Sequence, residues 1–319
     1  MKYLCNELYR HLLPGSLDDR ILYLSNEECE NCGRGYDLSE IEGMIGQPFY
    51  VNKAFLDRMP KLKWVQITGA GYDRADVEEL KKREIILTNT RGVMSISIAE
   101  DVFAKMLFFS REIRHMEDDS RDRHWDMFGQ DQWMCSCYTD LYGKTLGILG
   151  YGSIGSEIAK RAAAFGMKIH VFSRHPVTDP LVTRCFVGQE SVLEFYGSCD
   201  FLVLALPLTV NTHHMIDRKA FLAMKESAVL INVARGPIVD TRALFWALEE
   251  NRIRGAALDV FEQEPLPEDS VLWHHPKLFL TPHKAGMGDS WKRFIGELIV
   301  RNIGHFELQE ALENRIIIA

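Results

Sequence analysis

The chain has 319 residues, a length that suggests about two domains with a sizeable core in each. Its 46% hydrophobic and 26% charged residues are ordinary for a globular protein and argue against disorder. A net charge of -8 disfavours a sequence-independent hold on nucleic acid or on an anionic membrane, because both need a basic surface. No apolar run approaches the ~20 residues of a membrane span, and the polar start is not a secretory signal. We therefore expect a cytoplasmic protein that binds neither nucleic acid nor membrane.

The first hundred residues alternate strand and helix patterns, as a small α/β unit does. Strands are expected at 20–24, 64–68 and 85–88, with helices over 52–57 and 76–82. Gly69, Ala70 and Gly71 follow the second of these strands, where such a turn can expose consecutive backbone N–H groups to an anion. The residues alone leave this interpretation open against a tight turn that simply needs small side chains.

Seven cysteines, an odd number in a long chain, fit reduced thiols better than a disulfide framework. Cys29 and Cys32 have the spacing of half a zinc site. No second pair with suitable spacing completes it, so a plain loop without metal is the favoured interpretation.

A long helix is predicted to begin near Ser97. Ser97 and Glu100 have the spacing of a capping box, in which each side chain pairs with a backbone N–H of the first turn. Such a helix could carry the chain from one domain to the other. Its buried stripe is expected to comprise Val102, Met106, Phe109 and Ile113.

The stretch 115–142 is charged and aromatic, without a clean period. A packed domain rarely holds so long an irregular connection unless it has a function. An arm that contacts a second subunit would have this composition. We favour this dimerisation arm, and hence a homodimer, over the alternative of an active-site lid.

The residues that organise the chain lie at 145–155, where the short apolar run TLGIL is followed by GYGSIG. Gly150 permits a tight turn, Gly152 lets the backbone approach a pyrophosphate, and Gly155 lets the next helix pack on the strand. The phosphates would meet unpaired N–H groups at the start of that helix. A strand before the glycines and a helix after them favour a dinucleotide site over a turn without a ligand. The helix is expected to bury Ile158, Ala159, Ala162 and Phe165 and to end at Gly166, with a strand at 168–172.

Alternation of strands and helices continues to the end of this half, which predicts a parallel sheet. The expected strands are 201–205, 228–233, 256–260 and 278–280, with a helix over 241–251. Arg235, Glu264 and His283 come shortly after three of these strands. Ligands of open parallel sheets bind beyond the carboxyl ends of the strands, so these residues are candidates for one site.

The end of the strand 168–172 bears on the choice of nicotinamide cofactor. An enzyme that uses NAD usually places Asp or Glu here, which binds the adenosine ribose and repels a 2′-phosphate. This chain has Ser173, followed by Arg174, whose guanidinium can pair with a phosphate. We therefore predict that NADP(H) is preferred and that NAD(H) remains possible. The alternative is that Arg174 points into solvent and both cofactors are tolerated.

Several motifs now complete a resemblance. NVARG at 232–236, GAALDVFEQEP at 255–265 and TPHKAG at 281–286 look like signatures of the D-isomer-specific 2-hydroxyacid dehydrogenases. LPLT at 206–209 and NTRGV at 89–93 fit the same family in its order. The resemblance covers most of the chain and points to members similar to glyoxylate/hydroxypyruvate reductases.

The resemblance implies an α/β fold of two Rossmann-like domains, each a doubly wound parallel sheet, with a cleft between them. Residues 1–97 and 288–319 would form a flavodoxin-like substrate-binding domain, because the final helix crosses back. Residues 98–287 would form the NAD(P)-binding domain. The implied activity is hydride transfer between a nicotinamide cofactor and a small 2-oxo or 2-hydroxy acid of the D-isomer, in the reducing direction.

The resemblance also assigns roles to the candidate residues. His283 would be the general acid that protonates the substrate carbonyl, and Glu264 would hold the imidazole and favour its protonated form. Arg235 would bind the substrate carboxylate, together with backbone N–H groups of Gly69, Ala70 and Gly71. The implied cofactor contacts are Gly150, Tyr151, Gly152, Ser153, Ile154, Gly155, Ser173, Arg174, Leu206, Pro207, Thr212, Val233, Ala234 and Asp259, the last at the nicotinamide end.

Two residues depart from the family pattern. Lys284 and Met287 stand beside the histidine, where family members often have small or hydroxylated residues, so the pocket or the substrate is unusual. A nucleotide-sensing regulatory protein, similar to transcriptional corepressors of this family, is the alternative function. The sequence does not identify the side chain of the substrate.

Overall fold

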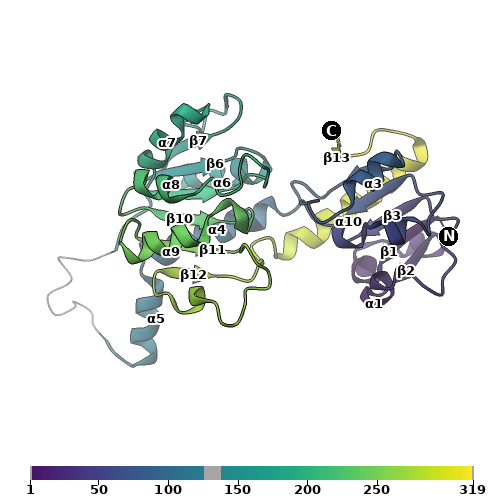
Figure 1. The fold of residues 1–319 in the computed structure, drawn as a ribbon, viewed down its shortest axis with the longest axis horizontal. Coiled ribbons are helices and arrows are strands. Elements are labelled where there is room, and N and C mark those ends of the chain that lie inside the picture. Colours follow the sequence, from purple (N-terminus) through teal and green to yellow (C-terminus); the bar gives the residue numbers. More distant parts are fainter. Residues whose placement is uncertain (1, 126–137, 318–319) are drawn as a thin grey trace. The chain divides into compact units, whose positions relative to one another are not determined.

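The computed structural model describes residues 2–125 and 138–317, and the chain divides into two compact units. One unit comprises residues 1–94 and 288–319, and the other comprises residues 95–287. Each unit contains a twisted sheet with helices packed on it (Figure 1). Both units are α/β, as predicted. Within the described residues, no helix is both long and apolar enough to span a bilayer.

The first unit is built on a six-stranded sheet with the order β13-β5-β4-β3-β1-β2. Five of its strands are parallel in the flavodoxin-like order, and β13 pairs antiparallel with β5. The strands are β1 (Tyr3–Asn6), β2 (Ile21–Leu24), β3 (Gly43–Gly46), β4 (Trp64–Ile67), β5 (Ile86–Thr88) and β13 (Arg315–Ile316). The helices are α1 (Asn26–Glu30), α2 (Lys53–Leu56), α3 (Val77–Lys82) and α10 (Asp289–Leu308).

Helix α10 joins the end of the chain to the first unit. Its apolar face packs against Tyr3 of β1 and Trp64 of β4 in a common core cluster. Asn302, fully buried in this helix, donates to Oε1 of Gln66 at 2.8 Å and accepts from the backbone N of Glu313 at 2.8 Å. A buried amide must find such partners, so Asn302 fixes the helix, the sheet and the tail in one arrangement.

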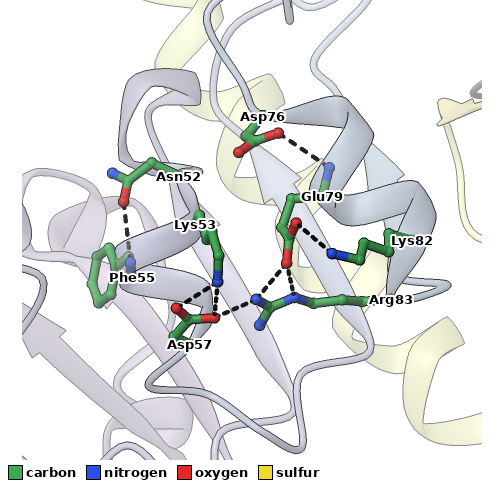
Figure 2. A network of polar contacts seen from close by, with 8 residues as sticks. All are labelled: Asn52, Lys53, Phe55, Asp57, Asp76, Glu79, Lys82 and Arg83. Atoms are coloured by element: carbon green, nitrogen blue, oxygen red, sulfur yellow. Dashed lines mark hydrogen bonds and ion pairs between the residues drawn. The ribbon is translucent and has the colours of Figure 1, made fainter.

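Helices α2 and α3 are joined on the surface of this unit by a polar network (Figure 2). Arg83, which caps the C-terminus of α3, donates to Glu79 at 2.6 Å and also pairs with Asp57 after α2. Asp57 accepts in addition from Nζ of Lys53 at 2.8 Å. Asp76 caps the N-terminus of α3 by accepting from the backbone N of Glu79 at 3.1 Å. The network orders two helices that are too short to be stable alone.

The second unit is built on a seven-stranded, fully parallel sheet with the order β12-β11-β10-β9-β6-β7-β8. Chain order reverses between β6 and β9, as in a doubly wound fold. The strands are β6 (Thr145–Leu149), β7 (Lys168–Phe172), β8 (Arg184–Phe186), β9 (Phe201–Leu204), β10 (Val229–Asn232), β11 (Gly255–Leu258) and β12 (Leu278–Leu280). The helices are α4 (Ser95–Ser110), α5 (Ile113–Arg121), α6 (Ser153–Ala164), α7 (Val192–Ser198), α8 (Arg218–Ala223) and α9 (Thr241–Glu249).

The core of the second unit lies on both faces of the sheet. One cluster holds residues of α7, α8 and α9, and the other holds residues of α4 and α6. Adjacent residues of one strand point to opposite faces, so Leu202 belongs to the first cluster and Val203 to the second. Burial on both faces explains why these strands are continuous apolar runs.

The structure corrects the expected start of the long helix. Helix α4 begins at Ser95 rather than after Ser97, and Ser97 is buried within it. Glu100 is not a cap, because it is exposed and pairs with Arg161 of α6 at 3.1 Å. Tertiary burial of the first turn thus overrides the local capping pattern. A true capping box instead joins Ser25 and Glu28 at the start of α1.

Two predictions of buried residues, Ile113 and Phe165, are also wrong. Helix α4 ends at Ser110, because Glu112 has a left-handed backbone with φ of 49°, and Ile113 therefore opens α5 and is 40% exposed. Phe165 is the C-cap of α6 and is 41% exposed, although its ring stacks on Phe103.

Strands β1 and β3 did not stand out in the sequence. Each has only four residues, and all of them are buried. A strand buried on both faces shows no alternation of polar and apolar residues. A segment this short therefore has no periodic signal in the sequence.

Candidate active site

The glycine turn after β6 has the geometry that a dinucleotide needs. Gly150 has φ of 98°, and a Cβ there would lie 2.7 Å from the backbone O of Ala205, at the end of β9. A Cβ at Gly155 would lie 2.5 Å from the backbone O of Gly150. At Gly152, in contrast, a Cβ would meet no heavy atom within 4 Å. The first and third glycines are therefore needed for packing, and the second leaves open space at the N-terminus of α6, where a pyrophosphate fits.

The loop after β9 lies beside this turn, because a Cβ on Gly150 would also approach Cβ of Leu206 to 2.8 Å. Thr212 orders the loop: its hydroxyl donates to the backbone O of Pro207 at 2.8 Å and accepts from the backbone N of Thr209 at 2.7 Å. Leu206, Pro207 and Thr212 thus lie where the sheet order reverses, which is the ligand-binding position of this fold.

Strand β10 leads into Val233, Ala234 and Arg235. Asn232, at the end of the strand, is buried; its Oδ1 accepts from the backbone N of Ala234 at 3.0 Å, and its Nδ2 donates to the backbone O of Arg235 at 2.9 Å. It therefore fixes the backbone from which Arg235 projects. This role of Asn232 was not predicted from the sequence, although a polar residue that ends an apolar strand is a recognisable signal.

Arg235 and Glu264 come from adjoining segments. Gly236 packs directly on the segment after β11, where a Cβ would lie 1.8 Å from the backbone C of Phe261. Only glycine allows this approach. The Arg235 guanidinium is partly buried and donates to the backbone O of Ala234 at 2.8 Å.

Glu264 and His283 form a direct pair. Nδ1 of His283 lies 2.8 Å from Oε2 of Glu264, and Oε1 of Glu264 accepts from the backbone N of Phe261 at 3.2 Å. The side chain of His283 is 50% exposed, whereas that of Glu264 is 21% exposed. The carboxylate engages Nδ1, so Nε2 is the ring nitrogen available to another molecule.

Asp259 holds the loop that carries His283. Its Oδ1 accepts from the hydroxyl of Thr281 at 2.6 Å and from the backbone N of Lys284 at 2.9 Å, and its Oδ2 accepts from the backbone N of Ala285 at 2.9 Å. Its backbone O also accepts from the backbone N of His283 at 2.8 Å. His283 has a left-handed backbone with φ of 53°, and this buried carboxylate stabilises the strained turn. A contact between Asp259 and the nicotinamide end stays a prediction.

The two residues that depart from the family pattern lie on this loop. The backbone N of Met287 donates to the backbone O of Lys284 at 2.9 Å, and both residues are exposed.

Ser173 and Arg174 come directly after β7. The backbone N of Ser173 donates to the backbone O of Phe186 in β8 at 3.1 Å, and its hydroxyl bonds to the backbone O of His175. Arg174 is exposed. No carboxylate occupies either position, which is the feature on which the predicted cofactor preference depends.

The remaining candidates lie in the first unit. Gly69, Ala70 and Gly71 follow β4, and the backbone O of Ala70 accepts from Nδ2 of Asn89 at 2.7 Å. The turn is thus ordered, and its role in substrate binding stays a prediction. Cys29 is buried in α1, and the described residues contain no cluster of three or more side chains that could hold a metal.

Comparisons with known proteins agree with this geometry. Residues 103–285 match the model of the D-isomer specific 2-hydroxyacid dehydrogenase, NAD binding domain. The chain is 39% identical over 270 residues to a glyoxylate reductase of Thermococcus litoralis, which covers 83% of this chain and 80% of that one. It is 38% identical over 245 residues to glyoxylate/hydroxypyruvate reductase B of Citrobacter koseri, covering 76% and 74% of the two chains.

A solved structure shares the fold over nearly the whole length. The D-isomer specific 2-hydroxyacid dehydrogenase from Xanthobacter autotrophicus, in complex with NADPH and MES, superposes with a TM-score of 0.81 at 27% identity and covers 99% of this chain and 98% of that one. The resemblance read from the motifs is thereby confirmed. The chain belongs to the D-isomer-specific 2-hydroxyacid dehydrogenase family and is a nicotinamide-dependent oxidoreductase.

Proposed function

We propose that this protein reduces small 2-oxo acids to 2-hydroxy acids with NADPH, giving the D-isomer where the product is chiral, and that glyoxylate and hydroxypyruvate are its substrates. The observation that carries the proposal is the pair of Glu264 and His283, held at 2.8 Å beyond β11 and β12 of the same sheet that presents the glycine turn. The relatives that are named for these two substrates support the substrate class.

Each residue of the site has a separate role in the reaction. When bound, the nicotinamide supplies the hydride. Nε2 of His283 donates a proton to the carbonyl oxygen of the substrate, and Glu264 orients the ring and stabilises the charged imidazolium through Nδ1. Arg235 binds the substrate carboxylate with its planar fork and favours negative charge on the neighbouring oxygen. The backbone N–H groups of Gly69, Ala70 and Gly71 supply further donors for that carboxylate.

Use of NADPH is supported by the residues after β7. The uncharged Ser173 does not repel a 2′-phosphate, and the exposed Arg174 can pair with it. The related Xanthobacter autotrophicus enzyme has been solved with NADPH, so the fold accommodates this cofactor. NADH is the weaker alternative.

A homodimer formed through the 115–142 arm belongs to the same proposal. Helix α5 buries none of its residues, and Met116 and Trp125 are 42% and 88% exposed. Exposed apolar side chains such as these are typical of a subunit contact. Residues 126–137 of the arm lie outside the described residues.

The proposal also places the enzyme in the cytoplasm. The five cysteines of the described residues are all free thiols, which suits a reducing compartment. The regulatory alternative gains no support from the relatives reported above, which are named as reductases and dehydrogenases.

A panel of 2-oxo acids tests the activity. Glyoxylate, hydroxypyruvate, pyruvate and a bulky aromatic 2-oxo acid are each offered with NADPH and with NADH, and turnover is followed by nicotinamide absorbance. His283→Ala, purified in the same way, reports any contaminating reductase. We expect the first two acids with NADPH to give the highest kcat/KM. Absence of turnover with every acid would overturn the proposal and revive the regulatory alternative.

A further inference from the structure

Tyr151 occupies the variable position between the first two glycines of the turn, and its hydroxyl makes a hydrogen bond within the protein. The hydroxyl donates to Oδ2 of Asp179 at 2.8 Å. Asp179 lies in the loop between β7 and β8, 28 residues farther along the chain. The pyrophosphate turn and the loop after β7 are therefore joined by a direct hydrogen bond between side chains.

Asp179 also gives that loop its shape. Its Oδ1 accepts from the backbone N of Leu181 at 2.9 Å, and its backbone O accepts from the backbone N of Val182 at 3.0 Å. Val177, Leu181 and Val182 are partly buried against the same core cluster as Tyr151. The far end of the loop is thus anchored, whereas Arg174 at its near end is exposed.

The charges of the pair are well defined. The pKa of Asp179 is lowered by the hydrogen bond from the backbone N of Leu181 and by the one from Tyr151, so the carboxyl group is ionised near neutral pH. The pKa of Tyr151 is raised by burial and by this carboxylate, so the hydroxyl keeps its proton and remains the donor. The Asp179 carboxylate is therefore negatively charged, and it is hydrogen-bonded to the neutral hydroxyl of Tyr151.

This arrangement matters for a phosphorylated cofactor. Arg174 can pair with a 2′-phosphate only if it lies at a fixed distance from the turn that binds the pyrophosphate. The bond to Tyr151 meets this requirement, because it ties the loop that begins with Arg174 to the glycine turn.

We propose that the hydrogen bond between Tyr151 and Asp179 is a positioning element that sets Arg174 relative to the glycine turn and thereby selects the 2′-phosphorylated cofactor. The inference rests on the proposed use of NADPH and extends it from the residue that meets the phosphate to the pair that places it. Tyr151 and Asp179 are positioning residues and take no part in the hydride transfer.

Binding of two small probes tests the inference without turnover. 2′,5′-ADP carries the 2′-phosphate and 5′-AMP lacks it, and titration calorimetry gives the ratio of their dissociation constants for the full-length protein. We expect the unmodified protein to prefer 2′,5′-ADP at least about tenfold. Tyr151→Phe should reduce this ratio by about three- to tenfold, as loss of one hydrogen bond allows.

Four further variants separate this role from general damage. Tyr142→Phe removes a hydroxyl from a tyrosine that is 80% exposed in the same unit, and it should not change the ratio. Asp179→Ala should also lower the ratio, but less than Tyr151→Phe because it removes a negative charge from the loop as well, and the double variant should match Asp179→Ala, because the two side chains form one interaction. Asp179→Asn retains hydrogen-bonding groups and should restore most of the preference.

The two proposals fail in different ways. A protein that binds both probes equally would overturn the preference for NADPH and this inference with it. A protein that prefers 2′,5′-ADP, and keeps that preference in Tyr151→Phe, would overturn this inference alone. Equal weakening of both probes in Tyr151→Phe would also overturn it, because the hydroxyl would then serve the turn as a whole rather than the selection of the 2′-phosphate.

Discussion

Nδ1 of His283 lies 2.8 Å from Oε2 of Glu264, although the two residues follow different strands and are 19 positions apart. Because the carboxylate engages Nδ1, Nε2 is the ring nitrogen that faces a ligand bound beside the pair. The half-exposed imidazole and its less exposed partner have the geometry of a proton donor with a fixed orientation.

Replacing His283 tests its role as the proton donor. We expect His283→Ala to lower kcat by about 10²- to 10⁴-fold while the Kd for NADPH barely changes, because the ring is remote from the phosphates. Steady-state kinetics and a fluorescence titration measure the two quantities. Glu264→Gln, which keeps the size of the side chain, should lower kcat less. Near-normal turnover of His283→Ala would remove the residue from the mechanism.

Asp259 is expected to act through the loop that carries His283. Asp259→Asn replaces one acceptor of a three-donor network by an NH₂ group, which costs about 1–3 kcal/mol and lowers Tm by about 2–8 °C. We expect kcat to fall at least about tenfold by displacement of the imidazole. Thr281→Val, which removes one donor only, should have a smaller effect. A rise in the Kd for NADPH in Asp259→Asn would show that Asp259 also contacts the cofactor; unchanged Tm and kcat would contradict the loop role.

Arg174 is predicted to determine cofactor preference. A charge-assisted hydrogen bond contributes about 1.5–3 kcal/mol, so the ratio of kcat/KM for NADPH over NADH should be roughly ten- to a hundredfold. Arg174→Ala should abolish most of this ratio by weakening NADPH selectively. Kinetics with both cofactors provide the measurement. Equal losses for both, or an initial preference for NADH, would contradict the assignment.

The network around Arg83 predicts a pH-dependent contribution to stability. Hydrogen bonds from Lys53 and Arg83 hold the pKa of Asp57 below its usual range, and the one from Arg83 does the same for Glu79. Because these pKa values are lower in the folded state, the stabilisation is present above the unfolded values of about 4 and is lost as pH falls through the folded ones.

Arg83→Gln should therefore lower Tm by about 1–3 °C at pH 7, a small effect because the pairs are near the surface, and by less at pH 3. Scanning calorimetry at several pH values measures the difference. Arg34→Gln, at an exposed position of the same unit, provides the control and should show no such trend. A difference that is constant across pH would exclude the ion pairs as its cause.

The exposed aromatic and apolar residues of α5 and the following segment predict a homodimer. Light scattering at micromolar concentration should give about twice the chain mass. Met116→Glu together with Trp125→Glu places like charges at positions that are 42% and 88% exposed, and it should shift the mass toward the monomer. A monomer mass for the unmodified protein would refute the arm as a subunit contact.

Much of the second unit could be predicted from sequence because its signals are local. The three glycines, the apolar strand before them and the helix after them are contiguous, and their roles follow from backbone geometry alone. Arg235, Glu264 and His283 could be placed beyond strand ends for the same reason. Local sequence patterns did not predict the structure where tertiary packing determines it, as at the start of α4 and in the buried strands β1 and β3.

By itself, then, the sequence determined the family, the α/β class and the residues that follow each strand. The tertiary structure decided that β10, β11 and β12 are neighbours, that Asp259 holds the histidine loop, and that Asp179 pairs with Tyr151. The physical reason is that the conformation of the backbone depends mainly on adjacent residues. The partner of a side chain such as Tyr151 depends instead on how segments distant in the chain pack together.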